Sequence, residues 1–82
     1  MIKIFMNKYE QQLKNRKWNT TETESRYIDV EEFDLITKES VVAFFKALGG
    51  VERIYRKNGK IIKLISTSPD RTERRIYEFE YR

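Results

Sequence analysis

Apolar and polar residues alternate most regularly at the C-terminal end of the chain. From Arg75 to Tyr81, arginine and aromatic residues occupy every second position, and an isoleucine and two glutamates lie between them. A period of two is typical of a strand with one buried face. Residues 68–71 come just before and place a proline where a type I turn favours it. The pattern therefore predicts a last strand over 72–81, entered through a tight turn.

The middle of the chain has a helical period instead. Four apolar residues recur at the spacing i, i+3, i+4 and i+7: Val41, Phe44, Phe45 and Leu48. Residues at this spacing share one face of an α-helix. Thr37 is a suitable N-cap because its hydroxyl can accept a hydrogen bond from a free amide of the first turn. Gly49-Gly50 supplies the left-handed residue on which helices commonly end. These signals predict an amphipathic helix over 37–48.

A β-hairpin is expected directly after this helix. The segments 51–55 and 60–66 flank Asn58-Gly59, the dipeptide that best accepts the two positive φ angles of a type I′ turn. Residues 61–65 have apolar side chains on both faces. We therefore expect the second strand of the hairpin to lie in the interior of a sheet, at least partly covered on both sides.

Two registers of this hairpin are compatible with the sequence. A two-residue turn places Tyr55 opposite Ile62, and a turn with a bulge at Gly59 places Ile54 opposite Ile62. A shift by one residue exchanges the two faces of a strand, so the register decides which side chains enter the core.

The first half of the chain is less regular. Residues 1–6 predict a first strand, and residues 26–33 predict another because their apolar and polar residues alternate. Residues 8–17 are good helix formers with few apolar side chains, so a short helix and a long irregular hairpin arm are both open. Residues 19–25 contain no apolar residue and predict an exposed loop.

Together these elements predict an α+β fold with the order β-(α)-β-α-β-β-β. A small antiparallel sheet of about four to five strands, with one main amphipathic helix packed on a face, is the simplest way to bury their apolar sides. At 82 residues the chain is expected to form one globular domain, 1–82, near the size at which a single core is just sufficient.

The composition argues against a membrane protein or a secreted one. No apolar run exceeds five residues, whereas about 20 are needed to span a bilayer. The first residues lack the apolar core of a signal peptide. The chain contains no cysteine and therefore no disulfide framework. We expect a cytoplasmic protein without a membrane partner.

Catalytic and metal-binding chemistry has little support in the sequence. With no histidine and no cysteine, the common catalytic triads and zinc sites cannot form, and no phosphate-binding glycine loop is present. One acidic cluster offers oxygen ligands for a divalent cation: Glu31, Glu32 and Asp34. Such clusters are ordinarily solvated surface. Glu78 and Glu80 are expected to pair with a cross-strand cation such as Lys63. We predict a protein that is not an enzyme and has no cofactor.

Charge is distributed unevenly along the chain, whose net charge is +4. Residues 1–18 contain five basic and one acidic side chain, residues 19–40 two basic and seven acidic, and residues 51–82 nine basic and five acidic. An acidic segment between two basic ones predicts a surface that attracts its partners locally.

The basic side chains near the C-terminus suggest a nucleic-acid interface. If the last three strands are neighbours, these residues converge on the hairpin tip and one sheet edge, where they can follow phosphates and stack on bases. The candidate residues are Arg53, Tyr55, Arg56, Lys57, Lys60, Lys63, Arg71, Arg74 and Arg75. DNA and RNA are both open as partners. A mixed-charge surface that serves only solubility is the simpler alternative. Trp18 is expected to belong to the core.

A protein–protein interaction module is the alternative from another class. The acidic run 29–34 can meet a basic partner, and the strand 72–81, if it lies at a sheet edge, can pair with a second copy to form a homodimer. Inhibitors and adaptors of this kind occur among the accessory proteins of phages and mobile elements. The predicted function is therefore that of a non-enzymatic binding protein, with nucleic acid preferred over a protein partner.

Overall fold

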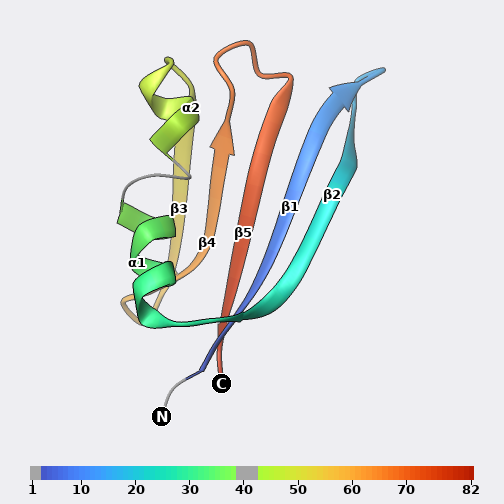
Figure 1. Ribbon diagram of the computed structural model, residues 1–82. Coiled ribbons are helices and arrows are strands. Elements are labelled where there is room, and N and C mark those ends of the chain that lie inside the picture. The colour runs from blue at the N-terminus through green and yellow to red at the C-terminus, as the bar shows by residue number, and fades with distance from the viewer. Residues whose placement is uncertain (1–2, 39–42) are drawn as a thin grey trace.

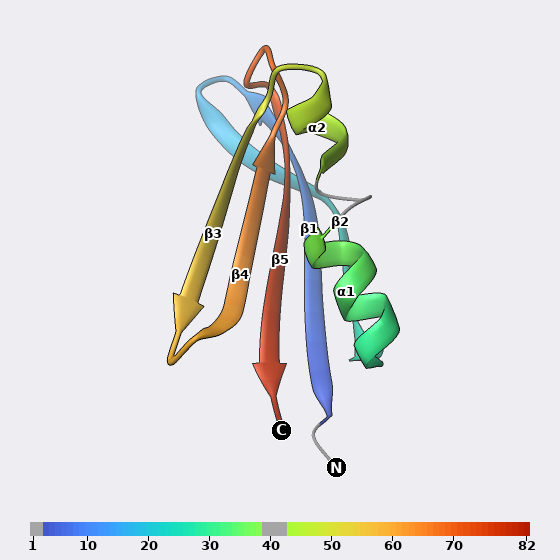
Figure 2. The same ribbon diagram turned by 90° about the vertical axis from the view of Figure 1, so that its left-hand side faces the viewer.

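Residues 3–38 and 43–82, which the computed structural model describes, form a five-stranded antiparallel sheet with two short helices on one side. The elements follow in the order β1 (Ile4–Lys14), β2 (Lys17–Ile28), α1 (Val30–Lys38), α2 (Ala43–Ala47), β3 (Val51–Lys57), β4 (Lys60–Thr67) and β5 (Glu73–Tyr81). The strands lie in the order β2-β1-β5-β4-β3, and both helices lie on the same side of them (Figures 1 and 2). The predicted α+β class with an antiparallel sheet is confirmed.

β5 lies at the centre of the sheet because the first and last strands of the chain pair with each other. β1 runs antiparallel along one edge of β5, and β4 runs antiparallel along the other. Lys3 and Arg82 extend the first pairing by two backbone hydrogen bonds of 2.9 and 2.8 Å. A homodimer formed through residues 72–81 would need a free edge on β5, and both of its edges are paired. The borders of the sheet are β2 and β3.

The core lies between the sheet and α1. The least exposed side chains come from three strands: Met6, Leu64, Ser66 and Tyr77. Ile36 and Phe33 of α1 pack onto this layer, and the Phe33 ring meets the Phe79 ring edge-on with centroids 5.0 Å apart. Burying one large apolar side chain contributes about 1.5–3 kcal/mol. These few contacts therefore hold α1 on the sheet.

The N-terminal half forms a long hairpin, so the predicted loop over 19–25 is wrong and the helical alternative for 8–17 is excluded. Residues 8–14 belong to β1 and are not helical, and residues 19–25 belong to β2 and are not a loop. The alternative of an irregular hairpin arm is confirmed, because the register of the pair shifts and leaves Thr21 as a bulge. Helix propensity is outweighed here because β1 also pairs with β5, a contact between distant parts of the sequence.

The turn of this hairpin has no strong sequence signal. Asn15 and Arg16 connect the strands with positive φ angles of 53° and 64°. Asparagine accepts this conformation readily, but arginine rarely adopts it. The Asn15–Arg16 pair is therefore a weaker hairpin signal than the Asn-Gly dipeptide of the second hairpin.

The strand predicted over 26–33 ends at Ile28, and α1 begins where the strand was expected to continue. Asp29 is the N-cap of α1. Its side chain accepts a hydrogen bond of 2.8 Å from the backbone N–H of Glu32, and its carbonyl accepts one of 3.0 Å from the N–H of Phe33. The helix is preferred because it turns Phe33 onto the core.

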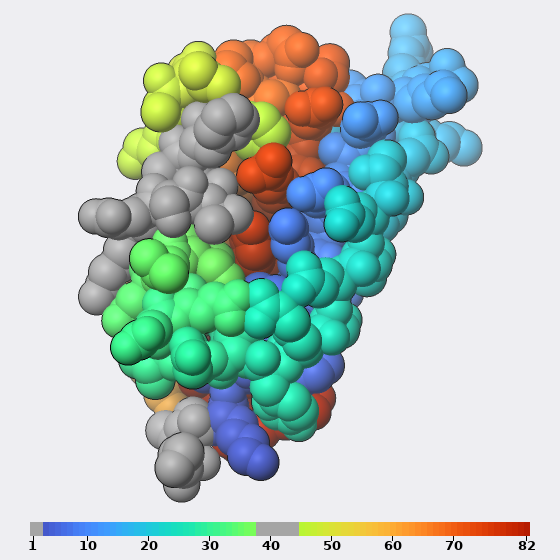
Figure 3. All heavy atoms as spheres, viewed as in Figure 1, coloured from blue at the N-terminus to red at the C-terminus, as the bar shows by residue number. Residues whose placement is uncertain are grey.

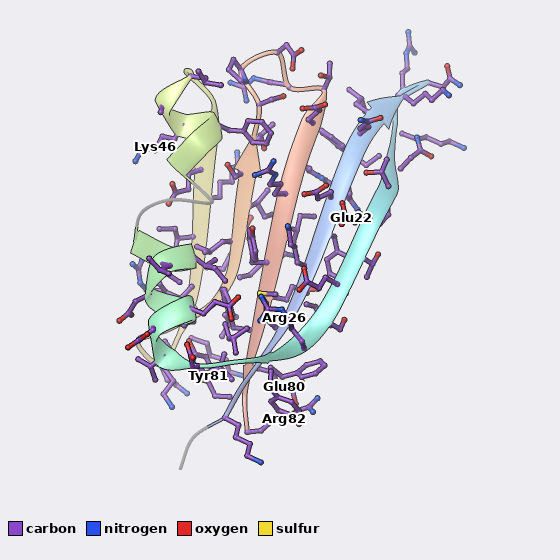
Figure 4. All side chains as sticks on the ribbon, in the orientation of Figure 1. Glu22, Arg26, Lys46, Glu80, Tyr81 and Arg82 are labelled. Atoms are coloured by element: carbon purple, nitrogen blue, oxygen red, sulfur yellow. The ribbon has the colours of Figure 1, made fainter. Side chains whose placement is uncertain are left out.

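Arg26 connects β2 to the first turn of α1. Its guanidinium donates to both carboxylate oxygens of Glu32, with a distance of 2.7 Å to Oε2, and to Glu24 at 2.5 Å. Figure 4 shows Arg26 on the side of β2 that faces the helices. The hydrogen bonds from Arg26 hold the pKa of Glu32 below its usual value.

The helix predicted over 37–48 is only partly confirmed. Thr37 does not cap a helix, because it lies in the last turn of α1 and its hydroxyl donates to the carbonyl of Phe33 at 2.9 Å. α2 falls inside the predicted span. Val41 and the side chain of Phe44 lie outside the described residues.

The C-terminal end of the predicted helix is confirmed. α2 is followed by Gly49, which has a φ of 100°, and the N–H of Gly50 donates to the carbonyl of Phe45 at 2.7 Å. Phe45 is buried, as its place in the apolar stripe predicts. Leu48 is 61% exposed because it lies in the turn beyond the helix.

The second hairpin has the predicted turn but neither predicted register. Asn58 and Gly59 have φ angles of 53° and 77°, as a type I′ turn requires. Pairing is regular at the tip, and then Ile62 is skipped as a bulge in β4. Tyr55 lies opposite Lys63 as a result. The prediction that this strand is interior is confirmed, because β4 lies between β5 and β3.

The turn predicted over 68–71 is confirmed. The N–H of Arg71 donates to the carbonyl of Ser68 at 2.9 Å. The Asp70 carboxylate accepts hydrogen bonds from the hydroxyl of Ser68 and from the backbone N–H and hydroxyl of Thr72. These bonds, that of Ser68 first, lower the pKa of Asp70. The turn leads directly into β5, the predicted last strand.

Replacing Gly50 by alanine should destabilise the fold. A Cβ at Gly50 would lie 2.2 Å from the backbone oxygen of Thr67 and 2.7 Å from that of Phe45. Because both atoms belong to the main chain, they cannot rotate away. We expect a loss of about 2 kcal/mol or more in the free energy of unfolding, measured with urea. The control Lys46→Ala, at an exposed position of α2, should change it by less than about 0.5 kcal/mol. Equal stabilities of G50A and the wild type would contradict the packing of α2 against the end of β4.

The ion pair between Arg26 and Glu32 should give the fold an acid-sensitive contribution. Because the folded pKa of Glu32 is lowered, the unfolded state binds more protons, and this part of the stability is lost as the pH falls. The urea midpoint of Glu32→Gln should therefore change less than that of the wild type between about pH 5 and 2. The control Glu31→Gln, on the same helical turn, should keep the wild-type slope. If the urea midpoints of E32Q and the wild type fell equally with pH, the ion pair would not be the source of this acid sensitivity.

Candidate nucleic-acid interface

The structure divides the nine predicted site residues into separate groups. β3, β4 and β5 are neighbours, as the hypothesis required. Arg56, Lys57 and Lys60 lie at the tip of the second hairpin, but Arg71 lies in the turn at the opposite end of the sheet (Figure 1). The expected convergence of the C-terminal arginines on the hairpin tip is wrong, because the antiparallel pairing of β4 with β5 places the start of β5 beside the end of β4.

Five of the predicted residues share the face of the sheet that the described helices leave uncovered. We call this the open face. The pairing of Tyr55 with Lys63, and of Lys63 with Glu78, places these side chains on one face. Ile54 and Tyr77 both lie in line with the core residue Leu64 and point to the helix side. Arg53 and Arg74, an odd number of residues away on the same strands, therefore point to the open face. The open face carries these predicted residues: Arg53, Tyr55, Lys57, Lys63 and Arg74.

β1 and β2 add aromatic residues to the open face. From the register of the first hairpin, its aromatic members are Phe5, Tyr9, Trp18 and Tyr27. Tyr27 and Tyr55 are 52% and 42% exposed. The face therefore has accessible rings on two strands that are separated by the rest of the sheet.

Arg74 and Trp18 form a stack at one end of the open face. The Arg74 guanidinium carbon lies 4.1 Å from the centroid of the Trp18 ring. Arg74 Nε donates to Gln11 Oε1 at 2.6 Å, and Gln11 Nε2 donates to the hydroxyl of Thr20 at 3.1 Å. Partial burial lowers the pKa of Arg74, although an arginine remains charged in a protein. Trp18 therefore belongs to the open face, and its predicted place in the core is wrong.

A second stack lies at the other end of the open face. The Arg82 guanidinium lies 4.4 Å from the Phe5 ring centroid and 5.7 Å from that of Tyr27. It donates to the Tyr27 hydroxyl at 2.9 Å and to both carboxylate oxygens of Glu80 at 3.0 and 3.1 Å. Arg82 thereby lowers the pKa of Glu80. Both ends of the open face thus present an aromatic ring fixed by an arginine.

The centre of the open face is mixed in charge. Glu78 lies directly opposite Lys63, as the sequence predicted. Burial, together with the neighbouring Glu78 carboxylate, raises the pKa of Tyr9. Ile76 is buried at 8% exposure between these polar groups. Glu78 has Lys63 beside it and Glu80 has Arg82 beside it. The exposed Arg53 therefore gives the open face additional positive charge.

Arg75, by contrast, lies on the side of the helices. Its Nε is 3.6 Å from Glu10, and its guanidinium lies 5.2 Å from the centroid of the Phe45 ring. Figure 3 shows a shallow hollow on this side between α2 and the first hairpin. Glu10, Phe45 and Arg75 line a volume of about 140 Å³ there. Because Arg75 is paired with a carboxylate on the opposite side, it does not belong to the open-face set.

The acidic run shows no arrangement for a metal ion. Within residues 3–38 and 43–82, no group of three or more acidic side chains is placed to share one. Glu31, Glu32 and Asp34 lie in α1 and not at a strand end. Asp29 caps this helix and Glu32 binds Arg26, so part of the run stabilises the fold.

The sequence did not identify the residues that the first hairpin adds to the open face. A helix or arm over 8–17 and a loop over 19–25 do not reveal the strand alternation that places Gln11 and Trp18 beside Arg74. The threonines of β2 were the available signal, since β-branched residues favour strands.

No family model, curated protein or solved structure matches this chain. The function must therefore be inferred from the geometry of the chain itself. Among the described residues, no helix has the length and apolar character needed to cross a bilayer.

Replacing Arg74 by alanine should expose Trp18. Loss of the guanidinium 4.1 Å from the ring removes its cover and a cation–π contact worth about 0.5–1 kcal/mol at a partly exposed site. We expect the tryptophan emission to shift to longer wavelength and to become easier to quench with acrylamide. Arg71→Ala, an exposed residue of the nearby turn, is the matched control and should leave the emission unchanged. An unchanged spectrum in R74A would contradict the stack.

Proposed function

We propose that the protein binds single-stranded nucleic acid across the open face. The observation that carries this proposal is the joint presence of exposed aromatic rings and unburied cations on one uncovered sheet face. A groove that combines positive charge with aromatic side chains can follow a phosphate backbone and stack on unpaired bases without sequence preference. The exposed Tyr55 beside Lys63, and the exposed Tyr27 beside Arg82, supply both kinds of contact.

Basic side chains at both ends of the sheet support the same proposal. One end has the exposed hairpin tip with Arg56, Lys57 and Lys60. The other end has the tip of the first hairpin, whose exposed cations are Lys14, Arg16 and Lys17. The backbone N–H of Leu13 donates to the carbonyl of Thr72 at 2.7 Å, so this tip lies beside the turn that carries Arg71. A strand that crosses the open face would meet cations at its entry and at its exit.

Single strands are favoured over a duplex by the position of the rings. Tyr27 and Tyr55 lie on the sheet face and not on a projecting ribbon. Bases become accessible to such a face only when they are unpaired. The second hairpin offers cations at its tip but no exposed aromatic ring beyond Tyr55, so groove entry by the ribbon alone has less support.

A protein-binding role through the acidic run 29–34 remains the alternative. It has less support because Asp29 and Glu32 are engaged within the chain. A cytoplasmic location and a phage or mobile-element origin remain predictions from composition.

Fluorescence anisotropy of labelled single-stranded oligonucleotides tests the proposal. We expect micromolar binding that weakens steeply between about 50 and 200 mM salt, because phosphate contacts release counterions. Tyr55→Ala should weaken binding about fivefold or more through lost stacking. Lys63→Ala should reduce the slope of log K against log salt by about 0.7, the value for one phosphate of a single strand.

Lys46→Ala is the matched control for charge. Lys46 is exposed on α2, on the helix side of the sheet, and Figure 4 shows it directed away from the strands. It should bind as the wild type does. No binding at tens of micromolar protein, or equal losses in K46A and K63A, would contradict binding at the open face.

A further inference from the structure

A second exposed feature of the sheet is the outer edge of β3. β3 forms one border of the sheet, and no strand among the described residues pairs along its outer side (Figure 2). An edge strand presents free backbone N–H and C=O groups that can pair with another chain. Ile54 and Tyr55 in its middle are 38% and 42% exposed. The edge therefore offers side-chain contacts in addition to backbone hydrogen bonds.

The other border of the sheet is less suited to pairing. β2 contains the bulge at Thr21, which interrupts its regular geometry. Its Arg26 is already held by Glu24 and Glu32 of the same chain. β3 has no such interruption, because the bulge of the second hairpin lies in β4 at Ile62.

We propose that β3 pairs with β3 of a second copy of this chain, antiparallel and about a two-fold axis at Ile54. Ile54 is the middle residue of β3, so this register uses the whole strand. On the helix side, Glu52 lies opposite Arg56 of the second copy, and the two Ile54 side chains meet on the axis. On the open face, Arg53 lies opposite Tyr55 of the second copy. A two-fold interface must be self-complementary. The sequence of β3 meets this condition in the register about Ile54.

The other symmetric registers lack this complementarity. Directly opposed residues of an antiparallel pair point to the same face of the sheet. The helix sides of the two copies therefore lie on one face only when the two-fold axis passes through a residue, and not between two residues. An axis at Glu52 or at Arg53 places two like charges directly opposite each other, and an axis at Tyr55 places Arg53 opposite Lys57. Like charges in directly opposed positions are destabilising. The register at Ile54 instead gives an ion pair, an apolar pair and an arginine–aromatic pair.

Dimerisation in this register would join the two open faces into one. Arg53 and Tyr55 of both copies would lie at the junction. The dimer does not depend on the proposed nucleic-acid function, because its support comes from the edge and the sequence of β3 alone.

The test is the oligomeric state of the wild type and of two charge variants. Sedimentation equilibrium from about 1 to 300 μM protein should show a mass that rises toward twice the 10.0 kDa of the chain. Glu52→Arg places arginine opposite Arg56, and Arg56→Glu places glutamate opposite Glu52. Each variant contains two like-charge pairs across the axis and should dimerise at least about tenfold more weakly than the wild type.

Mixing the two variants distinguishes this register from any other. In a mixed pair, the introduced arginine of E52R faces the introduced glutamate of R56E. The unchanged Arg56 of the first variant faces the unchanged Glu52 of the second, so every opposed charge is attractive. We expect the E52R and R56E variants to associate when mixed. Circular dichroism of each variant alone should match the wild type, since both positions lie outside the core.

Two results would overturn the proposal. One is a wild type that remains monomeric over the whole concentration range. The other is a dimer whose stability is unchanged in E52R and R56E, which would place the interface elsewhere on the molecule.

Discussion

The packing of α1 on the helix-facing side of β5 is the interaction on which the rest of the structure depends. Tyr77 and Phe79 form the floor of the core at 2% and 5% exposure, and the Phe33 ring of α1 meets Phe79 edge-on. Burial raises the pKa of Tyr77 to about 12. With the odd-numbered residues of β5 directed into the core, its even-numbered residues are directed to the open face. The alternation of one strand thus sets both the core and the candidate interface.

Among the described residues, the helices cover the sheet on one side only (Figures 1 and 2). The two described helices lie over the same face, and the side chains of the other face must be stable in water. The side chains of this open face are stabilised by contacts with one another. Arginines stack on Trp18 and Phe5, and Glu80 is paired with Arg82. Contacts of this kind are individually worth little to stability. They nevertheless hold rings and cations in fixed positions before any ligand arrives, which reduces the entropy cost of binding.

The parts of the fold that the sequence predicted are those with strong local signals. Asn58-Gly59 determined the second turn, and the alternation of residues 75–81 identified β5. The first hairpin was missed because β1 is held by β5, distant in sequence, and its turn contains Arg16 in a conformation that arginine rarely adopts. The start of α1 was missed because residues 26–33 alternate as a strand does, whereas the packing of Phe33 onto the core depends on distant parts of the chain. Accordingly Arg53, Tyr55 and Lys63 could be predicted as candidate site residues, whereas the contact of Arg74 with Trp18 could not.

Chemical-shift mapping tests the central claim, that the open face is the ligand-binding surface, most directly. Isotope-labelled protein would be titrated with an unlabelled single-stranded oligonucleotide, and shifts of backbone amides and of the Trp18 indole would be followed. We expect the largest changes at Trp18, Tyr55, Lys63 and their open-face neighbours, with α1 and α2 nearly unchanged. Changes confined to the helices, or none at saturating oligonucleotide, would contradict the claim.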